Sequence, residues 1–248
     1  MFTQIDDRCR NCDADITVGQ AYCGICGQKC ATTRLTMHEI GHNLLHTFVH
    51  VDRSILSLAR MLLVRPGVVA LYYVQGKRTR FFGPFAFLFV VVAAATAAIA
   101  FTGFRPVSSS TASSVGDFVQ THVNLYMLAQ VPLLAAFLRI LDLRGDFIYA
   151  EHLVLAAYTS SMRIAFAILI VIPVWYVFNI RNAAAGYLNY AVFPIWSLYF
   201  GFATSQFLRG NRVLTWCKGT LAAILTWASM QGLGNLVASL LALFAAKS

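Results

Sequence analysis

The chain has 248 residues, of which 58% are hydrophobic and only 12% are charged. This leaves too little polar surface to cover a water-soluble globule of that size, so the composition excludes an ordinary soluble domain. The formal net charge is +9, but the basic residues lie beside apolar segments and form no long basic surface interleaved with aromatic side chains. We therefore predict an all-α integral membrane protein that has the lipid bilayer as a partner, and we expect no nucleic-acid partner.

The N-terminal module, residues 1–33, is polar and rich in cysteine. It has no apolar segment of the kind that a cleavable signal peptide requires, so the N-terminus is expected to stay in the cytoplasm. Two Cys-x-x-Cys pairs are typical of a structural Zn²⁺ site with four thiolate ligands: Cys9, Cys12, Cys23 and Cys26. A redox dithiol is the alternative, which a reducing cytoplasm disfavours. A closed four-thiolate shell has no room for a substrate, so this small zinc ribbon is predicted to be structural rather than catalytic. Cys30 and Cys217 do not fit the shell.

Residues 34–80 are predicted to form amphipathic, interfacial helices. From residue 35 to about residue 51, apolar side chains recur on one helical face and histidines recur every four residues on the other. A second apolar helix, from residue 54 to about residue 64, is only about eleven residues long and is stopped by Pro66-Gly67. Because it is too short to span a bilayer, we expect both helices to lie in the cytoplasmic interface or to pack under the membrane bundle.

The histidine stripe contains the string His38-Glu39-Ile40-Gly41-His42, which matches the zincin pattern. In that pattern two histidines one turn apart bind zinc and the glutamate activates a water molecule. Four histidines at a spacing of four will flank one glutamate by chance in many sequences, and glycine is a poor residue for the middle of a ligand-bearing helix. A titratable face at the level of the lipid headgroups is the favoured interpretation.

The membrane domain, residues 81–248, is predicted to contain about five transmembrane helices. The apolar runs cover about residues 82–101, 122–138, 152–180, 187–208 and 219–244. The third run is longer than one span requires, so either one long helix or an interfacial helix followed by a span would fit. The last span is expected to pack closely through its small residues: Gly232, Gly234 and Ser239, with Ala222, Ala223 and Ala228.

The distribution of positive charge orients these spans. Fifteen Lys and Arg residues fall on the N-terminal side and three on the other, with Arg163 left unassigned. The positive-inside rule therefore predicts a cytoplasmic N-terminus and, with five spans, a periplasmic C-terminus. The membrane that we expect is a bacterial inner membrane.

Charged residues within the apolar runs are candidates for a function. Arg163 lies eleven residues into the third run, where it could line a substrate path or reach the cytoplasmic interface with its long side chain. Glu151 and His152 begin the same run and are expected to pair with Arg163 or with the basic residues of 77–80, which could also bind anionic lipid headgroups. No carboxylate residue follows Glu151, which argues against proton- or sodium-coupled transport through the last two spans.

Five short strings, the first in the ribbon and the last at the start of the third run, carry a family resemblance: Tyr22-Cys23-Gly24-Ile25-Cys26-Gly27-Gln28-Lys29, Val51-Asp52-Arg53, Arg65-Pro66-Gly67, Gly76-Lys77-Arg78-Thr79-Arg80-Phe81 and Tyr149-Ala150-Glu151-His152-Leu153-Val154. With them the chain resembles a family of bacterial membrane proteins, the domain of unknown function 3667. The resemblance implies a zinc ribbon fused to a helical membrane domain and carries no established activity. The family pattern has no HExxH.

The favoured function is a non-enzymatic membrane scaffold or regulator, in which the zinc ribbon docks a cytoplasmic protein or a second copy of the chain. One alternative is a membrane transporter that uses Arg163 with Glu151 and His152. The other is a membrane metalloprotease built on His38, Glu39 and His42.

Overall fold

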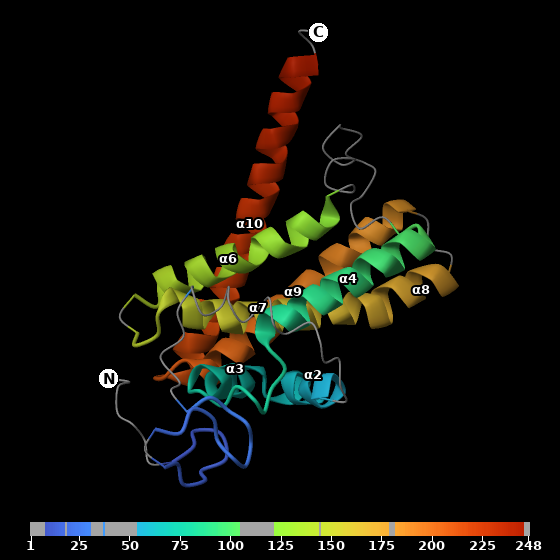
Figure 1. Ribbon diagram of the computed structural model, residues 1–248. Helices are drawn as coiled ribbons and strands as arrows, with labels where there is room; N and C mark the ends of the chain where they lie inside the picture. The colour runs from blue at the N-terminus through green and yellow to red at the C-terminus, as the bar shows by residue number, and fades with distance from the viewer. Residues whose placement is uncertain are drawn as a thin grey trace.

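The computed structural model describes residues 8–17, 19–30, 37, 54–104, 122–143, 145–178 and 182–245 (Figure 1). In chain order its helices are α2 (Ser54–Val64), α3 (Pro66–Val74), α4 (Pro84–Thr102), α6 (Val123–Leu141), α7 (Tyr149–Phe166), the π-helix η2 (Ala167–Val171), α8 (Ile172–Val177), α9 (Asn182–Phe207) and α10 (Arg212–Ala245). Pairing between extended segments is limited, in the described part, to two isolated bridges in the ribbon. The all-α prediction is confirmed for these residues.

The central helix of the bundle is α7. Every residue from 150 to 162 is buried, and α7 packs against α3, α4, α6 and α9. In a helix that is buried all round, polar side chains need hydrogen-bond partners within the protein. The hydroxyls of Thr159 and Ser161 do so by donating to carbonyl oxygens one turn earlier in α7, those of Leu155 and Ala157.

Three helices among the described residues are long and apolar enough to cross a bilayer: Pro84–Thr102, Val123–Leu141 and Tyr149–Val177. The first shows why. Its 19 residues begin at Pro84, end before Gly103 in the left-handed conformation (φ 68°), and extend about 28 Å, close to the thickness of a hydrocarbon core. These helices coincide with the first three predicted spans, and α9 and α10 occupy the places of the fourth and fifth.

The third apolar run forms one long helical segment, which decides between the two alternatives that its length left open. Tyr149–Val177 has 29 residues and is therefore about 43 Å long. The π-helical turn η2 directly precedes α8, which carries Pro173 near its start. A proline lacks the backbone N–H that an α-helix needs, and a π-turn is a common local adjustment.

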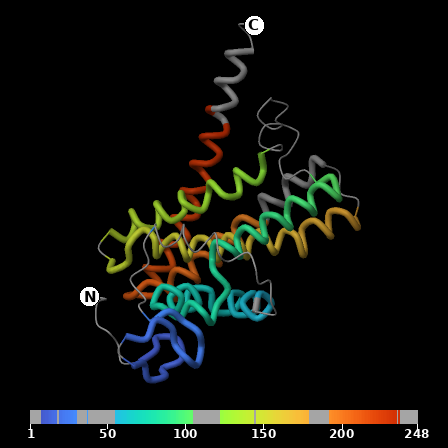
Figure 2. Tube along the Cα trace, viewed as in Figure 1, coloured from blue at the N-terminus to red at the C-terminus, as the bar shows by residue number. Residues whose placement is uncertain are grey.

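The short helices α2 and α3 lie between the ribbon and the long helices (Figure 2). The predicted helix of residues 54–64 is confirmed as α2, but α3 was not predicted. The sequence predicts Pro66 only as the end of a helix, whereas Pro66 also begins the next helix, because its fixed φ and missing N–H suit the first helical turn. The two helices meet at a bend of 117°. The other predicted amphipathic helix, residues 35–51, lies outside the described residues except for Met37.

Close packing between α9 and α10 depends on two glycines that the sequence did not single out. A Cβ at Gly201 would lie 2.2 Å from the Thr220 hydroxyl oxygen, and one at Gly219 would lie 2.4 Å from the Thr204 hydroxyl oxygen. Of the small residues predicted to give α10 its packing surface, Ala222 and Ala223 are fully buried. Gly232 and Gly234 have no atom within 4 Å of such a Cβ, so for these two glycines the prediction is wrong.

Candidate functional site

Two turns of the ribbon repeat the same backbone pattern, the second fourteen residues after the first. In each turn the N–H of the first cysteine donates to the carbonyl oxygen five residues later, and the intervening chain turns through a residue in the left-handed region. The bonds are Cys9 to Ala14 at 2.7 Å and Cys23 to Gln28 at 2.8 Å, and the left-handed residues are Asp13 (φ 60°) and Gly27 (φ 70°). Each turn thereby directs the two sulfurs of one Cys-x-x-Cys pair to the same side.

The four predicted ligands come together in the structure. The sulfurs of Cys9, Cys12, Cys23 and Cys26 all lie within 4.8 Å of one another. The shortest separations join the two turns, Cys9 to Cys26 at 3.5 Å and Cys12 to Cys23 at 3.6 Å. This group could hold a metal ion. Cys30 and Cys217 are not members of the group, as expected.

The electrostatics of the thiols favour a bound cation. Burial raises the pKa of the Cys26 thiol, but the Gln28 N–H and the Asn11 side chain outweigh burial and lower that pKa to about 6. The Ala14 N–H lowers the pKa of Cys12, yet burial and the neighbouring sulfurs raise it to about 12. Four sulfurs so close together cannot all ionise unless a cation shares their charge, and a coordinated metal ion supplies it.

Among the described residues, a buried carboxamide connects the ribbon to the helical part of the chain. Gln28 is only 3% exposed. Its side-chain oxygen accepts hydrogen bonds from the backbone N–H of Arg78 at 3.0 Å, the N–H of Thr79 at 3.3 Å and the Thr79 hydroxyl at 3.2 Å. These donors lie in the loop before α4. Sequence reasoning missed this contact, although both partners belong to strings that carry the family resemblance.

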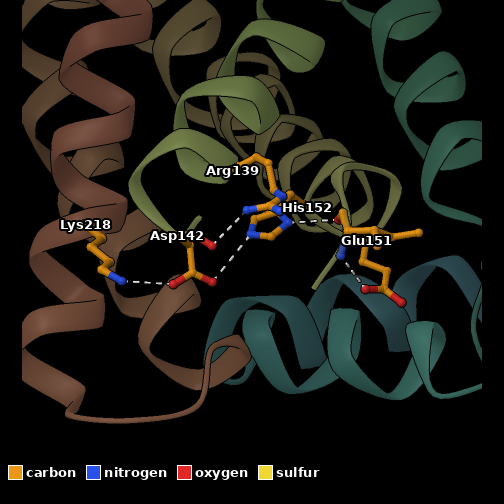
Figure 3. Close-up of polar contacts among 6 residues, drawn as sticks. Arg139, Asp142, Glu151, His152 and Lys218 are labelled. Atoms are coloured by element: carbon orange, nitrogen blue, oxygen red, sulfur yellow. Dashed lines mark hydrogen bonds and ion pairs between the residues drawn. The ribbon is translucent and has the colours of Figure 1, made fainter. Parts of the chain in front are cut away.

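A second candidate site is a polar cluster around Asp142, at the end of α6 (Figure 3). The Lys218 ammonium of α10 donates to one carboxylate oxygen at 2.9 Å, and His152 Nε2 of α7 lies 3.9 Å from the other. An Arg139 nitrogen donates to the backbone carbonyl oxygen of Asp142 at 3.0 Å. The carboxylate and the imidazole are both buried. The cluster therefore connects the ends of three helices, and the sequence did not predict it.

Hydrogen bonding fixes the orientation of the His152 ring and explains the role of Glu151. His152 Nδ1 lies 2.9 Å from the carbonyl oxygen of Ile148, which can only accept, so Nδ1 carries a proton and Nε2 faces Asp142. A Glu151 carboxylate oxygen accepts the N–H of Ile148 at 2.8 Å and so caps its own helix. Both residues thereby stabilise the start of α7.

Arg163 lies apart from this cluster. It is twelve residues after Glu151 in the same helix and so about 18 Å along it, which makes the expected pairing of Arg163 with Glu151 and His152 wrong. Its guanidinium donates to the Gln130 side chain of α6 and lies 4.6 Å from the centre of the Trp196 ring of α9. The residues of the suggested transport site therefore do not form one site. The HExxH residues 38–42 lie outside the described residues.

Comparison with known proteins gives a match to the segment that contains the bend between α2 and α3, which we call the elbow. The family model described as "Protein of unknown function (DUF3667)" matches residues 52–96. These include α2, α3, the loop before α4 with its basic residues, and the first part of α4. Neither the curated proteins nor the solved structures gave a match. Residues 52–96 of the chain thus match this family of unknown function, DUF3667, which agrees with the resemblance of its sequence.

Proposed function

We propose that the protein is a non-enzymatic scaffold or regulator of the bacterial inner membrane, with a structural zinc ribbon that docks a cytoplasmic partner. The observation that carries the proposal is the four-cysteine cluster held against the loop before α4. A tetrahedral zinc ion with Zn–S bonds of about 2.3 Å separates its sulfurs by about 3.8 Å. The closest pairs, at 3.5 and 3.6 Å, support zinc as the metal.

A zinc ion with four cysteine ligands has no open position for water or substrate, which supports a structural role. A ribbon of this size has almost no apolar core, so metal binding supplies most of its folding free energy, on the order of 10 kcal/mol. Zinc would thereby also keep Gln28 in its contact with the loop. The metal stabilises a surface rather than a reaction centre.

The surface that remains for a partner lies on the second turn of the ribbon. Tyr22 is 61% exposed and Ile25 is 80% exposed, although both are large apolar side chains next to metal-ligating cysteines. Aromatic and aliphatic side chains of this kind provide much of the binding energy in protein interfaces. We therefore assign partner docking to Tyr22 and Ile25.

Zinc content tests the metal assignment. Elemental analysis of the purified protein should find one zinc per chain. Cys9→Ser/Cys12→Ser should lose that zinc, because two cysteines cannot complete the shell, whereas His38→Ala/His42→Ala should retain it. A second zinc that is lost only in the histidine variant would contradict this proposal and favour the metalloprotease.

Crosslinking tests the docking assignment. In cells treated with a crosslinker, the wild-type chain should form a defined adduct that is lost in Tyr22→Ser/Ile25→Ser. The loss follows from removing the exposed apolar surface while all four cysteines stay in place. The mass of the adduct separates a second copy of the chain from a cytoplasmic protein.

The matched control is Lys29→Ser, because Lys29 is an exposed residue of the same turn that lacks an apolar surface. It should keep both the zinc and the adduct. The docking assignment is wrong if the chain that lacks residues 1–33 still forms the same adduct.

A further inference from the structure

The outward face of α2 is apolar and carries one arginine in its middle. Leu56, Leu63 and Val64 are all more than half exposed, and Arg60 is exposed between them on the same helical face. The opposite face, with Leu58 and Leu62, is buried. In a helix of eleven residues, such a face suits a position along the membrane surface, where leucines reach the acyl chains and the arginine reaches a phosphate.

The elbow between α2 and α3 is held rigidly against α9. The Gly67 N–H donates to the Gln206 side chain at 3.0 Å, and the Tyr199 hydroxyl donates to the Leu62 carbonyl oxygen at 2.7 Å. A Cβ at Gly67 would lie 2.0 Å from the carbonyl oxygen of Ala203, so α3 contacts the backbone of α9 directly. The outward face of α2 is therefore presented in a fixed orientation.

Three hydrogen bonds connect the elbow and the residues just before α4 to the same part of α7. The Tyr158 hydroxyl donates to the carbonyl oxygen of Phe82, just before α4. The Trp196 ring N–H donates to the Thr159 carbonyl oxygen, and Tyr199, which holds Leu62, is less than one turn from Trp196. Leu62 and Phe82 are thus connected to the same part of α7 through these side chains. A helix that crosses the bilayer begins at the level of the headgroups, so the elbow is near that level if α4 is a span.

The charge of this region is of one sign. From residue 53 to residue 83, before α4 begins, the sequence contains six Lys and Arg residues and no carboxylate. Two of them, Arg60 and Arg65, are exposed at α2. In the loop before α4, the Lys77 ammonium lies 5.0 Å from the centre of the Tyr72 ring, which orients it on an aromatic face typical of a membrane interface.

We propose that the α2–α3 elbow is a binding site for anionic phospholipid, in which Arg60 and Arg65 contact the headgroup phosphate while Leu56, Leu63 and Val64 contact the acyl chains. The proposal rests on the membrane location put forward above and adds a ligand class to the segment that the family model matches. Charge complementarity with the basic segment selects an anionic lipid over a zwitterionic one.

Binding is tested with the full-length protein in detergent micelles to which phosphatidylglycerol or phosphatidylcholine is added. Phosphatidylglycerol should raise the thermal unfolding temperature and phosphatidylcholine should raise it less. Arg60→Gln/Arg65→Gln should weaken phosphatidylglycerol binding roughly 30-fold, because each basic residue near an anionic surface contributes about 1 kcal/mol. Arg60→Lys/Arg65→Lys should retain most of the effect, which separates a charge effect from misfolding.

The matched control is Arg209→Gln/Arg212→Gln, which removes the same charge from two other exposed arginines. The proposal is overturned if this control loses as much lipid binding as the elbow variant, if the two lipids act equally, or if inorganic phosphate alone reproduces the stabilisation. Zinc content and carbonate-resistant membrane association are measured on the same preparations. Their loss would contradict the proposed function, whereas their retention together with absent lipid selectivity would contradict the lipid site alone.

Discussion

Gly145 leaves space for the buried carboxylate of Asp142. A Cβ at residue 145 would lie 2.0 Å from a carboxylate oxygen of Asp142 and 2.7 Å from its carboxyl carbon. The carboxylate is held by Lys218 of α10 at 2.9 Å and cannot move without weakening that contact. Gly145→Ala should therefore destabilise the protein by about 1–3 kcal/mol, as overpacking of a buried site does. The measurement is the thermal unfolding temperature in detergent.

Gly232→Ala is the control for this substitution. Gly232 lies in α10 with no atom within 4 Å of an added Cβ, and alanine is the better helix former. It should leave the unfolding temperature unchanged or raise it. If Gly145→Ala unfolded at the wild-type temperature, Asp142 would not be held in the position that the structure gives.

The contacts of single residues were predictable only where local spacing determines them. The sequence suggests that Glu151 pairs either with the basic residues of 77–80 or with Arg163, which lies in the same apolar run. Twelve residues of continuous helix separate Glu151 from Arg163 by about 18 Å, so helix geometry alone excludes the second pairing. The contact of His152 with Asp142 depends instead on how α6 and α7 pack, which hydrophobic periodicity does not specify.

At the scale of elements, the ribbon was predictable and its attachment was not. The Cys-x-x-Cys spacing brings together four sulfurs through local turns, whatever the rest of the fold does. The hydrogen bonds of Gln28 reach a loop fifty residues away, and a polar glutamine gives no sign in the sequence that it will be buried. The sequence therefore indicated the group of four cysteines but not the loop that Gln28 contacts.

The helix α3 shows a different limit. Its apolar residues, with Val69, Ala70 and Tyr73 buried, follow a proline that ends α2. A proline after a helix predicts the stop, yet the same residue is favoured at the first position of a new helix. Choosing between the two requires knowledge of what covers the next nine residues, which here are packed against α7 and α9.

At the scale of the whole molecule, the polar cluster lies at one end of the long helical segment Tyr149–Val177. His152 is six residues, or about 9 Å of helix, before Tyr158, whose hydroxyl donates to the carbonyl oxygen just before α4. Ionised side chains are costly within the hydrocarbon core and much less so beneath it. In the proposed membrane location, Asp142 and Glu151 lie at an end of these helices rather than at the centre of a span, where an ionised side chain costs most.

The number of spans gives the last prediction. With five spans, α9 and α10 both cross the bilayer, so the loop at Gly210 lies in the cytoplasm with the ribbon and the C-terminus lies in the periplasm. The positive charge of Arg209, Arg212 and Lys218 beside that loop supports this arrangement. Alkaline phosphatase fused after Ser248 should be active, because it is active only outside the cytoplasm, and green fluorescent protein inserted at Gly210 should fluoresce. The contrary result would be a fluorescent protein fusion after Ser248 that fluoresces and a phosphatase fusion there that is inactive. The number of spans would then be even, and α10 would not cross the bilayer.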